Sequence, residues 1–205
     1  MRAKRLVILV VVLVVIQLCY ASELVLRINS SAGLKQLIYD LHEQPWVVYF
    51  RLGNFLFENK YTQDSINAFM KSVKLNPKFE KSYHNLGVAY YQQGNLGTAI
   101  KWFKKAVELN PNYVKAHYSL GLAYYYNQDL DSAIDEIFTV IELDNTNANA
   151  TFDAGIMLVE RYKNSGNISD LRTAAKLFRR ADSIEPGFPH AASNAEIVES
   201  VLREN

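Results

Sequence analysis

The sequence contains very little cysteine, proline or glycine. Its one cysteine, Cys19, leaves no intrachain disulfide, so stability has to come from packing alone. Only five prolines and nine glycines occur in 205 residues, which suits a helical chain. Charge of one sign is not in excess either. The 22 basic and 21 acidic residues leave no basic stripe, and this excludes nucleic acid as a partner.

Motifs for catalysis and for cofactor binding are also missing. The chain has no phosphate-binding loop and no G-x-S-x-G or H-E-x-x-H pattern, and its four histidines lie far apart. Asp129 and Asp131 resemble calcium ligands, but the loop lacks the remaining ligands, so we predict that they cap a helix. We therefore expect no enzymatic activity, no cofactor and no metal.

The longest apolar run lies at the start of the chain. Basic residues precede it, Leu6 to Cys19 is almost wholly apolar, and Ala21 follows as a small residue at a cleavage position. This pattern predicts a signal peptide over residues 1–21 and export to the bacterial periplasm or cell envelope. The alternative is an uncleaved anchor through residues 6–19, although a span usually needs about 17–25 residues.

A repeat with a period of 34 residues fills most of the remaining sequence. Leu-Gly pairs recur at this interval, and an Ala-Gly pair continues the series; they are Leu52-Gly53, Leu86-Gly87, Leu120-Gly121 and Ala154-Gly155. Ala99 and Ala133 follow their glycines by twelve residues, and Phe69 and Phe103 follow theirs by sixteen. A fixed period of this length predicts stacked structural units that bury a core only together.

These residues resemble the tetratricopeptide repeat (TPR), whose signature is W-x2-L-G-x2-Y, then A-x3-F, then P. The second unit matches at eight positions, Tyr83, Leu86, Gly87, Tyr90, Ala99, Phe103, Ala106 and Pro111. The first unit departs from the pattern at Leu56 and Ser72. The resemblance covers residues 46–186. It implies an all-α fold, a right-handed α-solenoid of four TPR helix-turn-helix repeats plus a C-terminal capping helix.

The period also predicts the domain boundaries. We expect an N-terminal segment with one helix at 22–45, and then repeats at 46–79, 80–113, 114–147 and 148–186, followed by the capping helix at 187–205. The fourth repeat contains seven inserted residues. Seven is close to two helical turns, so the helices can lengthen without rotating their core faces. We expect an enlarged turn at 164–167 with Ser169 as the next helix cap. On the capping helix, Glu196, Glu199 and Arg203 are predicted to form the solvent-facing surface.

A second stripe of side chains runs beside the core stripe on the first helix of each repeat. It consists of Phe50, Asn54, Phe57, His84, Val88, Tyr91, Tyr118, Leu122, Tyr125, Phe152, Ile156 and Val159. In the TPR family this face lines a concave groove that takes peptide ligands. The resemblance therefore implies that these residues bind a partner, with Glu58, Lys81, Gln92 and Glu160 at the polar rim. The alternative is that some of them pack against the neighbouring repeat.

One group of TPR proteins holds the C-terminal carboxylate of heat-shock chaperones with five basic and amide side chains. Asn54, Asn85 and Lys115 stand at matching positions, but Phe50 and Ser119 replace two basic residues. The clamp is therefore predicted to be broken.

The predicted function is a scaffold or adaptor that binds a protein or peptide, from the envelope or secreted, in an aromatic-lined groove. Two alternatives remain open at this point. One is a structural or self-associating subunit whose groove is filled by its own N-terminal segment or by a second copy. The other is a carrier of a small apolar ligand.

Overall fold

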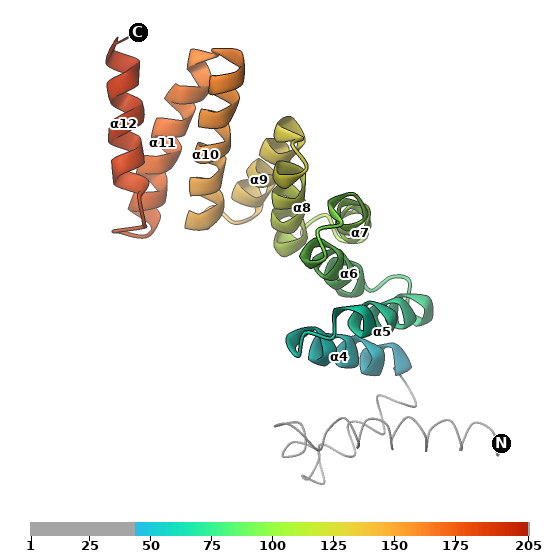
Figure 1. Ribbon diagram of the computed structural model, residues 1–205. Coiled ribbons are helices and arrows are strands. Elements are labelled where there is room, and N and C mark those ends of the chain that lie inside the picture. Colours follow the sequence, from blue (N-terminus) through green and yellow to red (C-terminus); the bar gives the residue numbers. More distant parts are fainter. Residues whose placement is uncertain (1–43, 205) are drawn as a thin grey trace, which may run out of the picture. The chain divides into compact units, whose positions relative to one another are not determined.

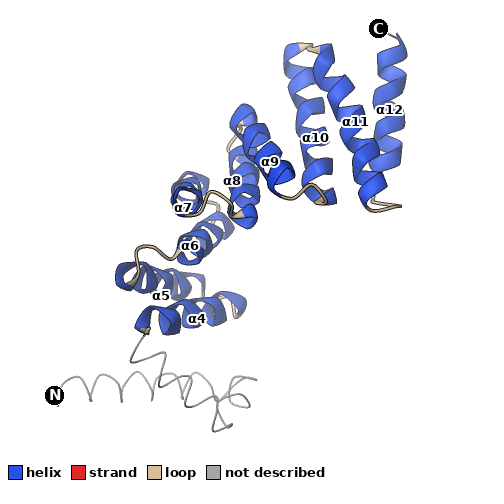
Figure 2. Ribbon diagram, turned by 180° about the vertical axis from the view of Figure 1, so that it is seen from behind, coloured by secondary structure: helices blue, strands red, loops and turns tan. Residues whose placement is uncertain are grey.

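The computed structural model of the protein describes residues 44–204, and every regular element in this range is an α-helix (Figures 1 and 2). The predicted signal peptide, the possible anchor at 6–19 and residues 22–43 of the predicted N-terminal segment lie outside the described residues. Within the described range, no helix has both the length and the apolar character that crossing a membrane requires.

The helices follow one another in pairs joined by short turns. They are α4 (Pro45–Glu58) and α5 (Thr62–Leu75), α6 (Glu80–Gln92) and α7 (Leu96–Leu109), α8 (Val114–Tyr126) and α9 (Leu130–Leu143), α10 (Ala148–Ser165) and α11 (Ile168–Ile184), and finally α12 (Ala191–Glu204). The chain divides into two compact units. One ends at Pro77 and contains the pair α4 and α5, and the other comprises Lys78–Asn205 and contains α6 to α12.

In the first unit, α4 packs on α5 where Gly53 of α4 meets the ring of Phe69 of α5. A Cβ atom at Gly53 would collide with the side chain of Phe69, which is itself only 1% exposed. The buried Ser72, where the repeat pattern has alanine, donates its hydroxyl to the carbonyl oxygen of Trp46 at 2.9 Å. The departure from the pattern at Ser72 is therefore compensated by a hydrogen bond between the two helices.

The second unit repeats the same contact between each first helix and its second helix. A Cβ atom would come within 2.5 Å of the Phe103 ring at Gly87 and within 2.6 Å of the Phe178 ring at Gly155. These separations are well below a normal carbon–carbon contact, so a residue with a side chain can occupy these positions only if the helices move apart. The 34-residue glycine series thus marks where the helices of each pair approach most closely.

Residues in the left-handed backbone region end the first helix of each repeat. They are Lys60, Gly94, Gln128 and Gly166, with φ angles of 66°, 75°, 64° and 72°. Side-chain oxygens then cap most of the following helices. Asp129 accepts from the Ser132 amide, which confirms its predicted role as a cap, and Asn95 accepts from an amide of α7 in the same way. The same prediction is wrong for Asp131, which lies within α9 and accepts a hydrogen bond from Arg161.

Two predictions for the fourth repeat are wrong. The inserted residues do not enlarge the turn, because Asn164 and Ser165 belong to α10 and only Gly166 and Asn167 separate it from α11. The additional residues lengthen both helices, to 18 and 17 residues, and this confirms the expectation that about two helical turns can be added while the core faces are kept. The cap of α11 is Asn167 rather than Ser169, whose amide donates to the Asn167 side chain at 3.1 Å.

The three residues predicted for the outer face of α12 differ in their contacts. Glu196 and Arg203 are exposed, as expected. Glu199 is also solvent-accessible, with its side chain 37% exposed, and it accepts two hydrogen bonds from Arg179 of α11, at 3.0 and 3.1 Å. It lies at the edge of the α11–α12 contact, so this carboxylate helps to attach the capping helix to the fourth repeat.

Candidate functional site

The candidate site residues are the twelve predicted groove residues on the first helices of the repeats, and we call the side that they occupy on α4, α6, α8 and α10 the first-helix face of each helix. All twelve are half-buried, neither enclosed in the core nor fully exposed. The predicted rim residues are all exposed; they are Glu58, Lys81, Gln92 and Glu160. Because the two units are described separately, Phe50, Asn54 and Phe57 form the part on α4, and the other nine residues form the part on α6, α8 and α10.

Three residues of the first-helix face also have a packing role that the sequence interpretation did not assign to them. Phe50 lies 6.1 Å from Phe69, His84 lies 5.6 Å from Phe103, and Phe152 lies 5.3 Å from Phe178, measured between ring centroids. Each precedes a repeat glycine by three residues, so its ring covers the second-helix phenylalanine that fills the space above that glycine. These three side chains therefore belong partly to the core.

Side-chain contacts join α6 to α8. The Nε2 atom of His84 lies 3.1 Å from the Ser119 hydroxyl, and its Nδ1 atom lies 3.0 Å from the Asn85 side-chain oxygen. Burial lowers the pKa of His84, and this outweighs the hydrogen bond with Asn85, which acts in the opposite direction. Ser119 thus contacts a neutral imidazole at a position where the chaperone clamp has a cation.

Two tyrosine hydroxyls join α8 to α10. Tyr118 donates to the Oδ2 atom of Asp153 and Tyr125 donates to the Oε2 atom of Glu160, both at 2.6 Å. Burial is the main cause that raises the pKa of Tyr118. The hydrogen bond to Glu160 is the main cause that raises the pKa of Tyr125 to about 12. Both hydroxyls are therefore protonated donors at neutral pH.

The sequence interpretation missed two residues of this surface. Tyr126 is 59% exposed and its ring lies 5.4 Å from Tyr125 and 6.0 Å from Tyr91, both in edge-to-face geometry. Asp153 is half-buried, and burial raises the pKa of its carboxyl. A repeat-based signal for both was available, since Tyr126 follows the rim residue Gln92 by 34 residues and Asp153 follows the clamp position Ser119 by 34.

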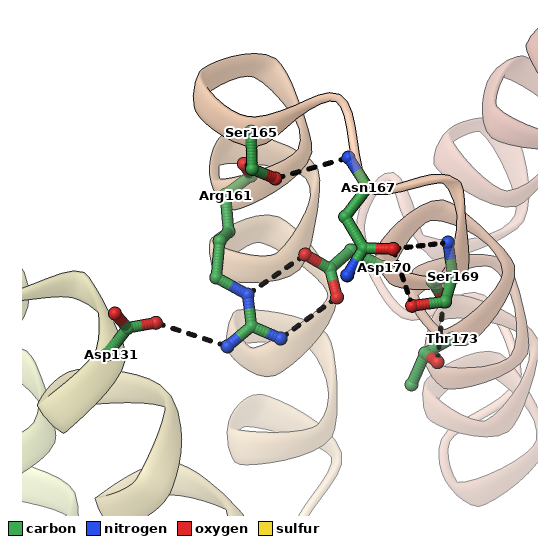
Figure 3. A network of polar contacts seen from close by, with 7 residues as sticks. All are labelled: Asp131, Arg161, Ser165, Asn167, Ser169, Asp170 and Thr173. Carbon is green, nitrogen blue, oxygen red and sulfur yellow. Dashed lines mark hydrogen bonds and ion pairs between the residues drawn. The ribbon is translucent and has the colours of Figure 1, made fainter.

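A second polar cluster lies at the turn end of the fourth repeat (Figure 3). The Arg161 guanidinium donates two hydrogen bonds of 2.9 Å to the buried Asp170 and one of 3.2 Å to the exposed Asp131 of α9. The cluster joins α9, α10 and α11. We assign it a structural role, because its only cation is already paired and no group of residues in the described range could hold a metal ion.

The comparisons with protein families identify the repeat. Models described as "TPR repeat" and "Tetratricopeptide repeat" match residues 89–128 and 68–101, and a further tetratricopeptide-repeat model matches 47–79 and 114–147. The chain belongs to the tetratricopeptide-repeat family. No curated protein sequence matches it.

Solved TPR structures share the fold of this TPR protein. MamA superposes with a TM-score of 0.67 at 25% identity, covering 76% of this chain and 81% of MamA. YrrB, a TPR protein with an unusual peptide-binding site, gives 0.68 at 18% identity, covering 82% and 83%. The first TPR of Spaghetti (RPAP3), bound to the HSP90 peptide SRMEEVD, gives 0.55 at 26% identity, covering 56% and 90%. The predicted fold class, an all-α solenoid of TPR helix pairs, is confirmed.

Proposed function

We propose that this TPR protein is a non-enzymatic scaffold that binds a segment of a partner polypeptide along the first-helix face of α6, α8 and α10. The observation that carries the proposal is the half-burial of nine aromatic, apolar and imidazole side chains that follow one another across three adjacent first helices. Residues of this kind at a surface with a polar rim are the usual anchors of a protein–protein contact. The peptide bound to the similar Spaghetti TPR structure supports a polypeptide as the partner.

A polypeptide fits the face better than a small apolar ligand does. The contacts between α6 and α8 and between α8 and α10 carry polar atoms at intervals along the face, at Ser119, Asp153 and Glu160. Apolar side chains such as Val88 and Leu122 lie between these contacts. An extended or helical peptide presents apolar and polar groups in alternation, and it can therefore match such a surface over its whole length.

The proposed site of action is outside the cytoplasm. The basic start, the apolar run at Leu6–Cys19 and the small residue Ala21 support export with cleavage after Ala21. Intact-mass analysis of the protein from its native host tests this proposal. We expect a mature chain that begins at Ser22, and a full-length species in the membrane fraction would replace cleavage with an anchor.

A peptide-display selection against the full chain tests the binding proposal. Selected peptides are then labelled, and their affinities for the wild type and for two variants are measured by fluorescence anisotropy. Leu122→Gln changes the first-helix face, and the matched control Leu143→Gln makes the same change at a 38%-exposed position at the end of α9. We expect Leu122→Gln to weaken binding at least about ten-fold and Leu143→Gln to leave it unchanged.

The opposite results are equally clear. Equal weakening by Leu122→Gln and Leu143→Gln would contradict binding on the first-helix face. If the wild type selects no peptide at all, the proposal fails. The face would then be covered by the chain's own N-terminal segment or by a second copy, as in the structural alternative.

A further inference from the structure

One part of the first-helix face combines tyrosine rings with carboxylates. Tyr91, Tyr125 and Tyr126 form a chain of rings with centroid separations of 6.0 and 5.4 Å. Glu160 accepts a hydrogen bond from the Tyr125 hydroxyl, and Asp153 accepts one from the Tyr118 hydroxyl. Both bonds join α8 to α10. We call these six residues the tyrosine–carboxylate cluster; they are Tyr91, Tyr118, Tyr125, Tyr126, Asp153 and Glu160.

The two carboxylates have no cationic partner within the described part of the chain. The ion pairs found there use other acidic residues, and neither Asp153 nor Glu160 takes part in one. Arg161 directly follows Glu160, but its guanidinium is turned to Asp170 and Asp131 (Figure 3). A tyrosine hydroxyl occupies one lone pair of each carboxylate, which leaves further acceptor positions unused.

The rings add to the negative character of the cluster. An aromatic ring carries negative charge density on its faces and attracts an ammonium or guanidinium group within about 6 Å of its centroid. Tyr126 is 59% exposed, so its ring is accessible from the solvent. After the larger effect of burial, electrostatic interaction with Tyr126 contributes to the raised pKa of Tyr91, which agrees with their being close neighbours.

We propose that the tyrosine–carboxylate cluster binds a lysine or arginine side chain of the partner segment. The cation would pair with Glu160 and pack against the ring of Tyr126, so that the partner is recognised as a basic segment. An acidic segment is disfavoured, because it would bring like charges to Asp153 and Glu160. The inference rests on the proposed function, since it specifies the chemistry of the polypeptide that the first-helix face takes.

The test uses the full chain and the peptides selected by display. Each selected peptide is compared with a form in which its basic residue is replaced by Gln, and binding is measured by fluorescence anisotropy at low and high salt. Two variants change the cluster. Glu160→Gln removes the unpaired charge and keeps an acceptor, and Tyr126→Ala removes an exposed ring. The matched control is Glu142→Gln, which removes an exposed carboxylate from the second helix α9.

We expect the selected peptides to contain lysine or arginine. Replacing that residue, introducing Glu160→Gln or introducing Tyr126→Ala should each weaken binding at least about five-fold, and added salt should weaken binding to the wild type. Glu142→Gln should have no effect. Because Tyr126 and Glu160 are both exposed, neither change is expected to affect folding, and circular dichroism checks this.

Two results would overturn the inference, and they differ in what they say about the proposed function. If the peptides lack cations, or if Glu160→Gln and Tyr126→Ala bind them like the wild type while Leu122→Gln weakens them, the cation site is wrong and the scaffold function stands. If no peptide is selected by the wild type, both proposals fail together.

Discussion

The second and fourth repeats are built on the same contact but differ in length and in chemistry. In the second repeat, Gly87 on a 13-residue helix faces Phe103. In the fourth, Gly155 on an 18-residue helix faces Phe178. The seven inserted residues therefore leave the glycine–phenylalanine contact in place, because they are divided between two helices at the end remote from it.

What differs is how the remaining length is held together. The longer helices of the fourth repeat are joined near their turn by the Arg161–Asp170 ion pair in addition to buried apolar side chains such as Leu158 and Leu171. The first-helix face differs as well, with the neutral His84 in the second repeat and the carboxylates Asp153 and Glu160 in the fourth. The repeated core thus determines the fold, and the positions that vary between repeats are those that can determine the partner.

The largest effect is expected at the Arg161–Asp170 ion pair of the fourth repeat. Arg161→Met would leave the buried Asp170 carboxylate without its cation, which typically costs about 3 kcal/mol or more. We expect a large loss in the thermal or denaturant midpoint measured by circular dichroism. The control Asp131→Asn removes the partner that is 82% exposed and should cost less than about 1 kcal/mol. Equal effects of the two changes would show that the pair with Asp170 is not the stabilising one.

The shared contact is expected to give the next largest effect. Gly87→Leu and Gly155→Leu would both overpack the space filled by Phe103 and Phe178, at a cost of roughly 1–3 kcal/mol or more. Gly97→Ala is the control, because a Cβ atom at this helical position meets nothing within 4 Å. It should be neutral or slightly stabilising. A wild-type melt for Gly87→Leu alone would show that the two repeats do not share the contact.

The fold was largely predictable because the repeat imposes it many times over. Glycines and large apolar residues recur every 34 residues and predict the same helix-pair geometry in each unit. One departure from the pattern, such as Ser72, therefore does not obscure that geometry. The length of the connection in the fourth repeat was not predictable in the same way. An insertion of seven residues fits either a longer turn or longer helices, and only Asn167 capping α11 and Gly166 with its φ of 72° decide between them.

The candidate site was less predictable because the residue types at its bonding positions change from repeat to repeat. The hydrogen bonds themselves recur at one spacing, since His84–Ser119, Tyr118–Asp153 and Tyr125–Glu160 are each 35 residues apart. The sequence placed Tyr118 and Tyr125 on the first-helix face but gave no partner for either hydroxyl. Asp153 and Glu160 become those partners only when α8 and α10 stand next to each other in space. The expectation that side chains of the first-helix face are available to a ligand therefore applies fully to Tyr126. It applies only in part to residues such as Tyr118 and Tyr125, which also join neighbouring helices.

The contact between Tyr118 and Asp153 predicts a moderate effect that depends on pH. Burial raises the folded-state pKa of Asp153 above its ordinary value of 3.8. The native state therefore binds more protons than the unfolded state in this range, and this group's contribution to stability falls as the pH rises through the folded-state pKa. Asp153→Asn should abolish that decrease and keep an acceptor for Tyr118. Melting midpoints of both proteins between about pH 3 and pH 7 check the sign.

A change of Tyr118, the donor in this contact, distinguishes the contribution of the hydrogen bond from that of the packed ring. Tyr118→Phe keeps the packing but leaves the half-buried Asp153 without its donor, so it should cost about 1–2 kcal/mol at neutral pH. Tyr125→Phe removes an equivalent bond to the exposed Glu160, which water can replace, and should cost less. Equal losses would show that burial of the carboxylate does not matter.

The smallest effect concerns the turns, where the second and fourth repeats use glycine and the third does not. Gly94 and Gly166 adopt the left-handed region without a Cβ penalty, whereas Gln128 adopts it with a φ of 64°. A residue with a side chain costs roughly 1–2 kcal/mol in this region, and part of this is offset by the greater freedom of glycine in the unfolded chain. Gln128→Gly should therefore stabilise the protein by about 0.5–1 kcal/mol, seen as a higher melting midpoint.

The reverse change, Gly94→Gln, should lower the midpoint by a similar amount, because a Cβ atom there meets nothing within 4 Å and only the backbone strain differs. A gain from Gln128→Gly without a loss from Gly94→Gln would mean that the Gln128 side chain, rather than its backbone, sets the stability of the third turn.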